Sequence, residues 1–143
     1  NYSVIVNGKN PIEAHEYLGR DLQGMDVIIV DDMIASGDSV IDVCKQLKER
    51  GAARIFVFST FGLFTAGLET LDKAYEEGLF TRIFTTNLVY QTPELLSREW
   101  YGDVNMCKYV AYLIDTLNHD ESISSLLDQS KRIHKFLNEH KAK

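Results

Sequence analysis

The sequence predicts an α/β fold, a three-layer sandwich with a mainly parallel sheet, followed by a C-terminal helical tail. Two nearly uninterrupted apolar runs, Val27–Val30 and Arg54–Ser59, have the composition of parallel strands that are buried on both faces. Between them, Val40–Arg50 has apolar residues at helical spacing, and Gly51 ends this helix. A strand, a helix and a second buried strand in this order form a right-handed βαβ unit.

The segment before these strands is predicted to contain one strand and one helix. A short strand covers Tyr2–Val6. A helix then opens with Asn10 as its N-cap, Pro11 at the first helical position and Glu13 at the third, and Gly19 ends it.

The segment after them continues the alternation of helices and strands. A helix is predicted over Ala66–Glu77 and a third parallel strand over Arg82–Thr86, followed by a single helical turn over Pro93–Arg98. Residues 99–102 form either a short last strand or a link. The residues that close the third strand, 85–87, carry hydrogen-bonding side chains and serve either as ligands or as ordinary turn formers.

The tail is predicted to be helical. Asp103 caps a helix in which apolar residues recur at intervals of three and four. A final helical region begins at Asp120 and breaks near residues 128–130. We expect one continuous domain over residues 1–143, with a core over about 1–102 and the tail over about 103–143.

One loop, residues 60–65, is unusually apolar. It carries Phe61, Leu63 and Phe64 directly after the second buried strand. Either these side chains cap the core, or they contact another domain or subunit.

Length, composition and charge bound the class of protein. A chain of 143 residues with 45% apolar content can bury its own core as a single domain. The net charge of −6 argues against a general nucleic-acid surface, and no run approaches the ~20 apolar residues of a membrane span. Cys44 and Cys107 are too far apart in sequence for a metal or redox motif, and Cys44 falls on the apolar face of its helix. We therefore expect a cytoplasmic protein without nucleic-acid or membrane partners.

The start of the chain points to a longer protein. It begins with Asn1 rather than Met and shows no basic and apolar regions of a signal peptide. We expect the sequence to be a fragment.

The most informative stretch is the turn that follows Val27–Val30. Asp31 and Asp32 come first, and a short loop of turn-forming residues leads to a helix that begins with Ser39 as the predicted N-cap. Gly37 in this loop can adopt a positive φ without steric cost. Loop N–H groups and the positive end of the helix dipole converge at such a turn, so we expect an anion site, and phosphate is the obvious ligand.

The paired carboxylates add a second chemistry to this turn. Ligands of open α/β sheets bind at the carboxyl ends of the strands, where Asp31 and Asp32 can take sugar hydroxyls or a magnesium ion. The stretch has neither the Gly-Lys-Ser/Thr ending of a nucleotide triphosphate loop nor the Gly-x-Gly-x-x-Gly of a dinucleotide fold.

The stretch Val27–Ser39 resembles the phosphoribosyl-diphosphate signature of type I phosphoribosyltransferases and ribose-phosphate pyrophosphokinases. The sequence further along resembles the pyrophosphokinase C-terminal domain, in Gly51–Arg54, in Ser59–Thr65 and in Phe84–Leu88. The match spans roughly residues 7–88, and Leu95–Leu127 resembles one longer subgroup of the same family.

This resemblance implies a type I phosphoribosyltransferase-like fold and part of a ribose-phosphate diphosphokinase. That enzyme moves a diphosphoryl group from MgATP to ribose 5-phosphate, a reaction that depends mainly on positioning and charge neutralisation. Asp31 and Asp32 are then the expected catalytic residues and Mg²⁺ ligands. The residues expected to bind ribose 5-phosphate are Ala35, Ser36, Gly37, Asp38 and Ser39.

Several features depart from the family pattern. Ala35 stands where many members have a carboxylate or a hydroxyl, and the Gly37-Asp38 pair is closer to the transferase loop. The Asp38 carboxylate repels a phosphate unless it points away or binds a metal. The family's ATP-binding half has no equivalent here, so the isolated chain is expected to be inactive and ATP to bind mainly through the absent N-terminal domain of a homo-oligomeric enzyme.

Two other functions stay open. A type I phosphoribosyltransferase needs a hood over the sheet to hold its base, and no aromatic-rich hood is visible outside the tail. A non-catalytic regulatory homologue of the synthetase is the second, and Ala35 favours it.

Overall fold

The computed structural model describes residues 21–141 of the chain. The strand expected over Tyr2–Val6 and the helix expected to end at Gly19 lie outside the described residues. The chain divides into two compact units, residues 1–104 and 105–143, and each is described by itself.

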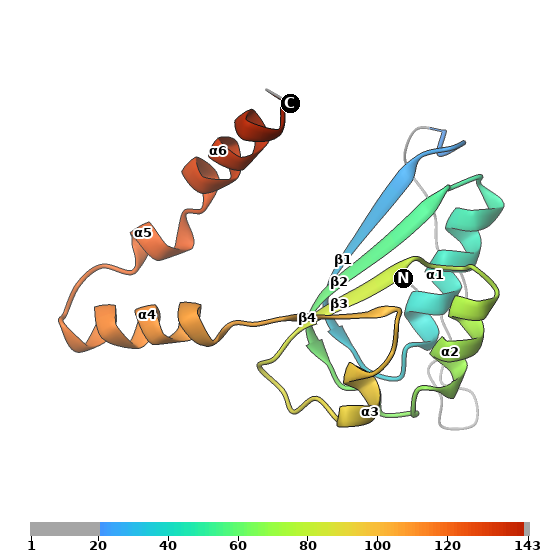
Figure 1. Cartoon of the computed structure of the whole chain (residues 1–143), viewed down its shortest axis with the longest axis horizontal. Helices are drawn as coiled ribbons and strands as arrows, with labels where there is room; N and C mark the ends of the chain where they lie inside the picture. Colours follow the sequence, from blue (N-terminus) through green and yellow to red (C-terminus); the bar gives the residue numbers. More distant parts are fainter. Residues whose placement is uncertain (1–20, 142–143) are drawn as a thin grey trace, which may run out of the picture. The chain divides into compact units, whose positions relative to one another are not determined.

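The first unit is built on four strands that form one parallel sheet, in the order β1-β2-β3-β4 (Figure 1). Each strand pairs in parallel with the next one along the chain. The predicted α/β fold with a parallel sheet is confirmed, and the segment expected to be either a strand or a link contributes β4. The strands are β1 (Asp26–Ile34), β2 (Arg54–Gly62), β3 (Arg82–Thr86) and β4 (Tyr101–Val104).

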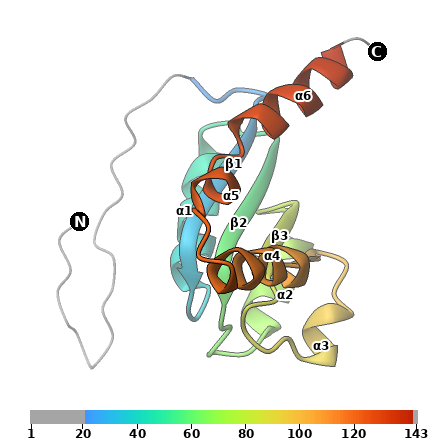
Figure 2. The same ribbon diagram turned by 90° about the vertical axis from the view of Figure 1, so that its left-hand side faces the viewer.

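Three helices belong to this unit: α1 (Asp38–Glu49), α2 (Glu69–Glu76) and the single turn α3 (Pro93–Leu96). Because both right-handed crossovers progress in the same direction across the sheet, α1 and α2 lie on one face of it (Figure 1). Figure 2 views the sheet from the other side, with these two helices behind the strands. Helix α2 begins later than predicted because Gly67, at φ 84°, leaves the helical conformation.

The core lies between the sheet and these two helices. Ile55, Val57 and Ile83 from the strands pack in one cluster with Cys44 of α1 and Leu71 of α2, and all five are fully buried. Burial raises the pKa of the Cys44 thiol to about 12. Cys44 is therefore a core residue, as its place on the apolar face of the helix predicts.

The opposite face of the sheet is also apolar. Ile28 and Val30 are 65% and 79% exposed, and the register places them beside Phe56 and Phe58 of β2. The Phe58 ring stacks on Phe84 with centroids 4.8 Å apart. Apolar side chains on both faces are typical of a parallel sheet in a three-layer fold.

One polar cluster holds β4 and α3 against α2. The Asp72 carboxylate accepts hydrogen bonds from Arg98 Nε at 3.0 Å and from Trp100 Nε1 at 2.7 Å. Trp100 is 2% exposed, so its indole N–H would otherwise be buried without a partner. The hydrogen bond from Asp72 also raises the pKa of Arg98.

The apolar loop after β2 is divided in two by the structure. Phe64 is buried and packs edge to face with Trp100 and Tyr101, so it caps the core. Phe61 and Leu63 are 38% and 44% exposed. For these two, a contact with another domain or subunit stays a prediction.

The second unit contains α4 (Cys107–Asn118), α5 (Ser124–Leu127) and α6 (Ser130–Lys141). The helical tail and the break near residues 128–130 are as predicted. Asp103 does not cap α4, because β4 continues to Val104 and the Asn105 side chain accepts the amide of Cys107 at 2.9 Å instead. Among the described residues, no helix is long and apolar enough to cross a membrane.

Candidate functional site

The turn between β1 and α1 places the predicted anion site. Gly37 has φ 96°, so the positive φ expected from the sequence is present. Gly37, and not Ser39, is the N-cap of α1, and no side chain caps that end. The helix can start earlier because the left-handed glycine completes the turn, and the Ser36 hydroxyl accepts the amide of Asp38 at 3.4 Å.

The first turn of α1 suits an anion. Its amide groups have no acceptors within the helix, and the helix dipole gives that end a positive potential. A cavity of about 120 Å³ opens at this end. Its lining is Asp31, Met33, Ile34, Ala35, Ser36, Gly37, Ser39 and Val40. Five of the seven predicted site residues therefore meet at one cavity, and the other two, Asp32 and Asp38, are not among its lining residues.

Asp38 is explained by a local hydrogen bond. Its carboxylate Oδ2 accepts from the Ser36 hydroxyl at 3.0 Å. The carboxylate is therefore held by a loop residue and does not line the cavity, which removes the repulsion that an adjacent phosphate would feel. The same bond occupies the Ser36 hydroxyl proton, so the loop N–H groups and Ser39 are the donors left for an anion.

The two neighbouring carboxylates do not act as a pair in this structure. Both lie inside β1, because Met33 and Ile34 continue the pairing with β2. Successive side chains of a strand point to opposite faces, so Asp31 faces the cavity and Asp32 faces away from it. The Asp32 amide donates to Asp31 Oδ1 at 2.8 Å, which helps to orient the carboxylate that lines the cavity.

Asp31 is the better magnesium ligand of the two. Mg²⁺ is usually held by one or two carboxylates and completes its octahedral shell with water and substrate oxygens. The described part of the chain has no group of three or more His, Cys, Asp or Glu that could enclose a metal. An ion shared with a bound sugar phosphate therefore fits at Asp31, and Mg²⁺ binding stays a prediction.

The loop after β2 supports the cavity from behind. The amides of Leu63 and Thr65 donate to the carbonyl oxygens of Ile34 and Ala35, both at 2.9 Å. The two loops at the carboxyl ends of β1 and β2 are thus joined by backbone hydrogen bonds. Sequence reasoning missed this contact, and its only signal was the unusual apolar content of residues 60–65.

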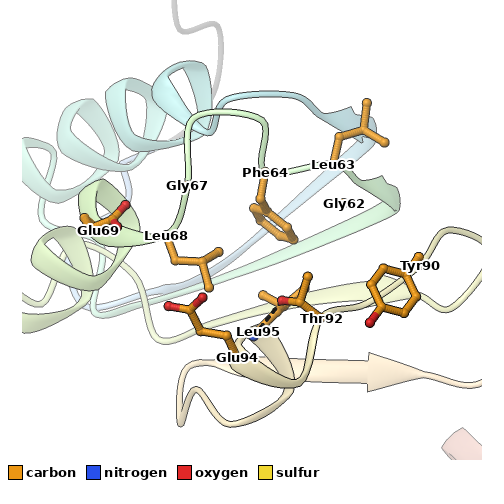
Figure 3. Close-up of a pocket in the computed structure, with 10 residues that line it drawn as sticks. All are labelled: Gly62, Leu63, Phe64, Gly67, Leu68, Glu69, Tyr90, Thr92, Glu94 and Leu95. Atoms are coloured by element: carbon orange, nitrogen blue, oxygen red, sulfur yellow. Dashed lines mark hydrogen bonds between the residues drawn. The ribbon is translucent and has the colours of Figure 1, made fainter.

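A second cavity, of about 190 Å³, lies on the other side of this loop (Figure 3). Phe64 and Leu68 project from the loop toward Thr92 and Glu94. The charged residues in its lining, Glu69 and Glu94, are both acidic. A phosphate finds no cation there, so the smaller cavity at α1 is the better anion site.

The polar residues at the end of β3 have structural partners. Thr85 is 1% exposed, and its hydroxyl lies 2.6 Å from the Tyr101 hydroxyl. The Thr86 hydroxyl donates to the carbonyl of Thr60 at 2.6 Å. Of the two roles considered for residues 85 and 86, the structural one therefore accounts for their side chains.

Comparison with known proteins identifies the family. The sequence model of the phosphoribosyl synthetase-associated domain matches residues 3–128. The chain belongs to this family. The resemblance inferred from Val27–Ser39 is thereby confirmed.

The relatives of this phosphoribosyl synthetase-associated domain are ribose-phosphate pyrophosphokinases. The one from Vibrio cholerae is 27% identical over 119 residues, which cover 83% of this chain and 37% of the relative. The one from Shewanella oneidensis is 33% identical over 109 residues, which cover 74% of this chain and 33% of the relative. The chain thus spans about a third of the length of the curated relatives it matches.

A solved structure supports the fold. The crystal structure of phosphoribosylpyrophosphate synthetase from Mycobacterium smegmatis superposes with a TM-score of 0.61 and 20% sequence identity. The match covers 71% of this chain and 33% of that one.

Proposed function

We propose that this domain binds ribose 5-phosphate in the cavity at the start of α1, as the C-terminal domain of a ribose-phosphate diphosphokinase. The observation that carries the proposal is the cavity itself, because it joins Asp31 of β1 to the loop Ala35–Ser39 at a helix N-terminus. A sugar phosphate needs both parts: donors for the phosphate and a carboxylate for the hydroxyls.

In the longer protein, the domain would hold the sugar for diphosphoryl transfer from MgATP. The loop N–H groups and the Ser39 hydroxyl bind the 5-phosphate, and Asp31 accepts hydrogen bonds from ribose hydroxyls and ligates Mg²⁺. Bound Mg²⁺ supplies charge neutralisation for the transferred group. Asp32 faces away from the cavity, so we expect the change Asp31→Asn to weaken binding more than Asp32→Asn does.

The remaining parts of the activity lie elsewhere. We place ATP binding mainly in the N-terminal region that the relatives have and this chain does not span, so the isolated chain makes no phosphoribosyl diphosphate. A cytoplasmic, homo-oligomeric enzyme is the corresponding proposal for the longer protein.

A non-catalytic regulatory homologue is the second candidate. Ala35 lines the cavity with a methyl group, which offers no ligand to the sugar or the phosphate. Such a protein would keep sugar-phosphate binding without making product. Assay of the full-length protein with ATP and ribose 5-phosphate separates the two candidates.

Titration of the chain with ribose 5-phosphate, followed by amide NMR, tests the proposal. A helix N-terminus stabilises an exposed anion by roughly 0.3 to 1 kcal/mol, and several N–H groups add to this. We expect a Kd on the order of millimolar, with shifts centred on Ser36, Gly37 and Ser39. No shifts at tens of millimolar, or shifts centred elsewhere, would refute the proposal.

A pair of glycine variants provides the control. A Cβ on Gly37 would lie 3.3 Å from side-chain atoms of Leu71, and its φ of 96° disfavours a branched residue. Gly37→Val should therefore abolish binding. Gly78 also has a positive φ, but a Cβ added there would have no atom within 4 Å, and Gly78→Val should leave binding unchanged.

A further inference from the structure

An apolar wall stands beside the proposed sugar-phosphate site. Met33 lines the cavity with Asp31 and the loop, and its side chain is 46% exposed. Its partner in the register with β2 is Phe61, which is 38% exposed. Paired residues of neighbouring strands project from the same face, so the thioether and the aromatic ring form one exposed apolar surface, the Met33–Phe61 wall.

This wall has no role in binding ribose 5-phosphate alone. The groups of that ligand that need partners are its phosphate and hydroxyls, and the loop and Asp31 already offer these partners. A thioether and an aromatic ring instead favour contact with a flat ring, through sulfur–aromatic and ring–ring contacts.

The charges around the wall narrow the kind of ring. Among the residues that line the cavity, Asp31 is the only one with an ionisable side chain. A ring that carries its own negative charge would be repelled there, whereas an uncharged heterocycle with donor groups would not. Because Met33 follows Asp31 by two residues on the same face of β1, a ring attached to the bound sugar can reach the wall.

We propose that the domain binds purine nucleoside 5′-monophosphates, with the phosphate and ribose in the sugar-phosphate site and the base on the Met33–Phe61 wall. This inference rests on the proposed function, because the wall gains a ligand only if the sugar phosphate is held beside it. Its consequence is that such a nucleotide competes with ribose 5-phosphate for the domain.

The three methionines of the chain make the test direct. Labelling with [¹³C-methyl]methionine gives separate signals for Met25, Met33 and Met106. Met25 is 43% exposed and does not line the cavity, so it is a matched control for Met33. The probes are adenosine 5′-monophosphate and ribose 5-phosphate, each titrated into the intact 143-residue chain.

We expect adenosine 5′-monophosphate to bind about tenfold more tightly than ribose 5-phosphate and to shift the Met33 methyl signal through the ring current of the base. The Met25 signal should stay in place. The ratio of the two Kd values should fall to about one in Met33→Ala and in Phe61→Ala, and should stay near ten in Met25→Ala.

The failure of this inference is distinguishable from that of the proposed function. If ribose 5-phosphate shifts the amides of Ser36–Ser39 but the nucleotide binds no more tightly, or leaves the Met33 methyl signal unchanged, the wall does not hold a base and the sugar-phosphate site stands. If neither ligand shifts those amides, both proposals are wrong.

Discussion

Helices α1 and α4 have similar apolar periodicity but opposite burial. Helix α1 buries Val40, Ile41, Cys44 and Leu47, whereas α4 has no buried residue. In α4, Ile114 and Leu117 are 62% and 57% exposed. An apolar stripe thus predicts that a helix forms, but the partner of the stripe comes from pairing between distant segments, which periodicity does not reveal.

The difference follows from what the sheet supplies. Strands β1, β2 and β3 bring residues more than twenty positions apart into register, and α1 and α2 pack on the surface they create. In the second unit, histidines make local contacts, such as His119 Nδ1 to the carbonyl of Asp115 at 2.8 Å and His134 Nδ1 to that of Ser130 at 2.7 Å. We therefore expect substitutions in the first unit to cost far more stability than matched ones in the second.

The largest contrast is expected between two leucines. Leu71 of α2 is fully buried, and Leu117 of α4 is 57% exposed. Leu71→Ala should lower the free energy of unfolding by about 2–5 kcal/mol, because it leaves a cavity in the core, and Leu117→Ala should change it by no more than about 0.5 kcal/mol. Urea unfolding followed by the fluorescence of Trp100, the sole tryptophan, measures both. Equal losses in the two variants would contradict the comparison.

A second contrast is expected at alkaline pH. Burial raises the pKa of Cys44 from 9.0 to about 12, so the folded protein keeps a proton that the unfolded chain releases. Stability should therefore fall between pH 9 and pH 12, by about 1.4 kcal/mol per pH unit at most. Cys44→Ala should flatten this slope, while Cys107→Ala, at an exposed position of α4, should keep it. Unfolding midpoints measured from pH 8 to pH 11 would reveal a slope that Cys44→Ala leaves unchanged, which is the opposing result.

The smallest contrast compares two tyrosines. The buried Tyr101 hydroxyl lies 2.6 Å from Thr85 Oγ1 and accepts from Gln91 Nε2 at 2.6 Å. Tyr101→Phe leaves these groups without that partner and should cost about 1–3 kcal/mol. Tyr112 is half exposed, so Tyr112→Phe should cost less than about 0.5 kcal/mol. Thermal unfolding that ranks the two variants the other way would show that the Tyr101 hydrogen bonds do not stabilise the core.

Much of the fold could be predicted because its signals are local. The apolar run of β1, the helical spacing of α1 and the positive φ of Gly37 each depend on a few consecutive residues. The ends of the elements depend on distant partners. Strand β1 continues to Ile34 because it pairs with Gly62, and β4 includes Asp103 because it pairs with Thr85. Nothing near Ile34 or Asp103 in the sequence carries that information.

The site shows the same limit. The sequence brings Asp31 and the loop Ala35–Ser39 to one turn, and the structure joins them at one cavity. The extent of β1 decides that Asp32 faces the other way, and one hydrogen bond to Ser36 decides where Asp38 points. Adjacent residues in sequence were therefore a poor guide to which carboxylates act together.

Hydrogen exchange of the intact chain, with and without ribose 5-phosphate, tests most directly whether the site belongs to the first unit alone. The ligand should slow exchange in residues 34–41, and in the residues 63–65 that donate to Ile34 and Ala35, with no change in residues 105–141. Protection confined to α4 or α6, or absent from the loop at saturating ligand, would contradict this account.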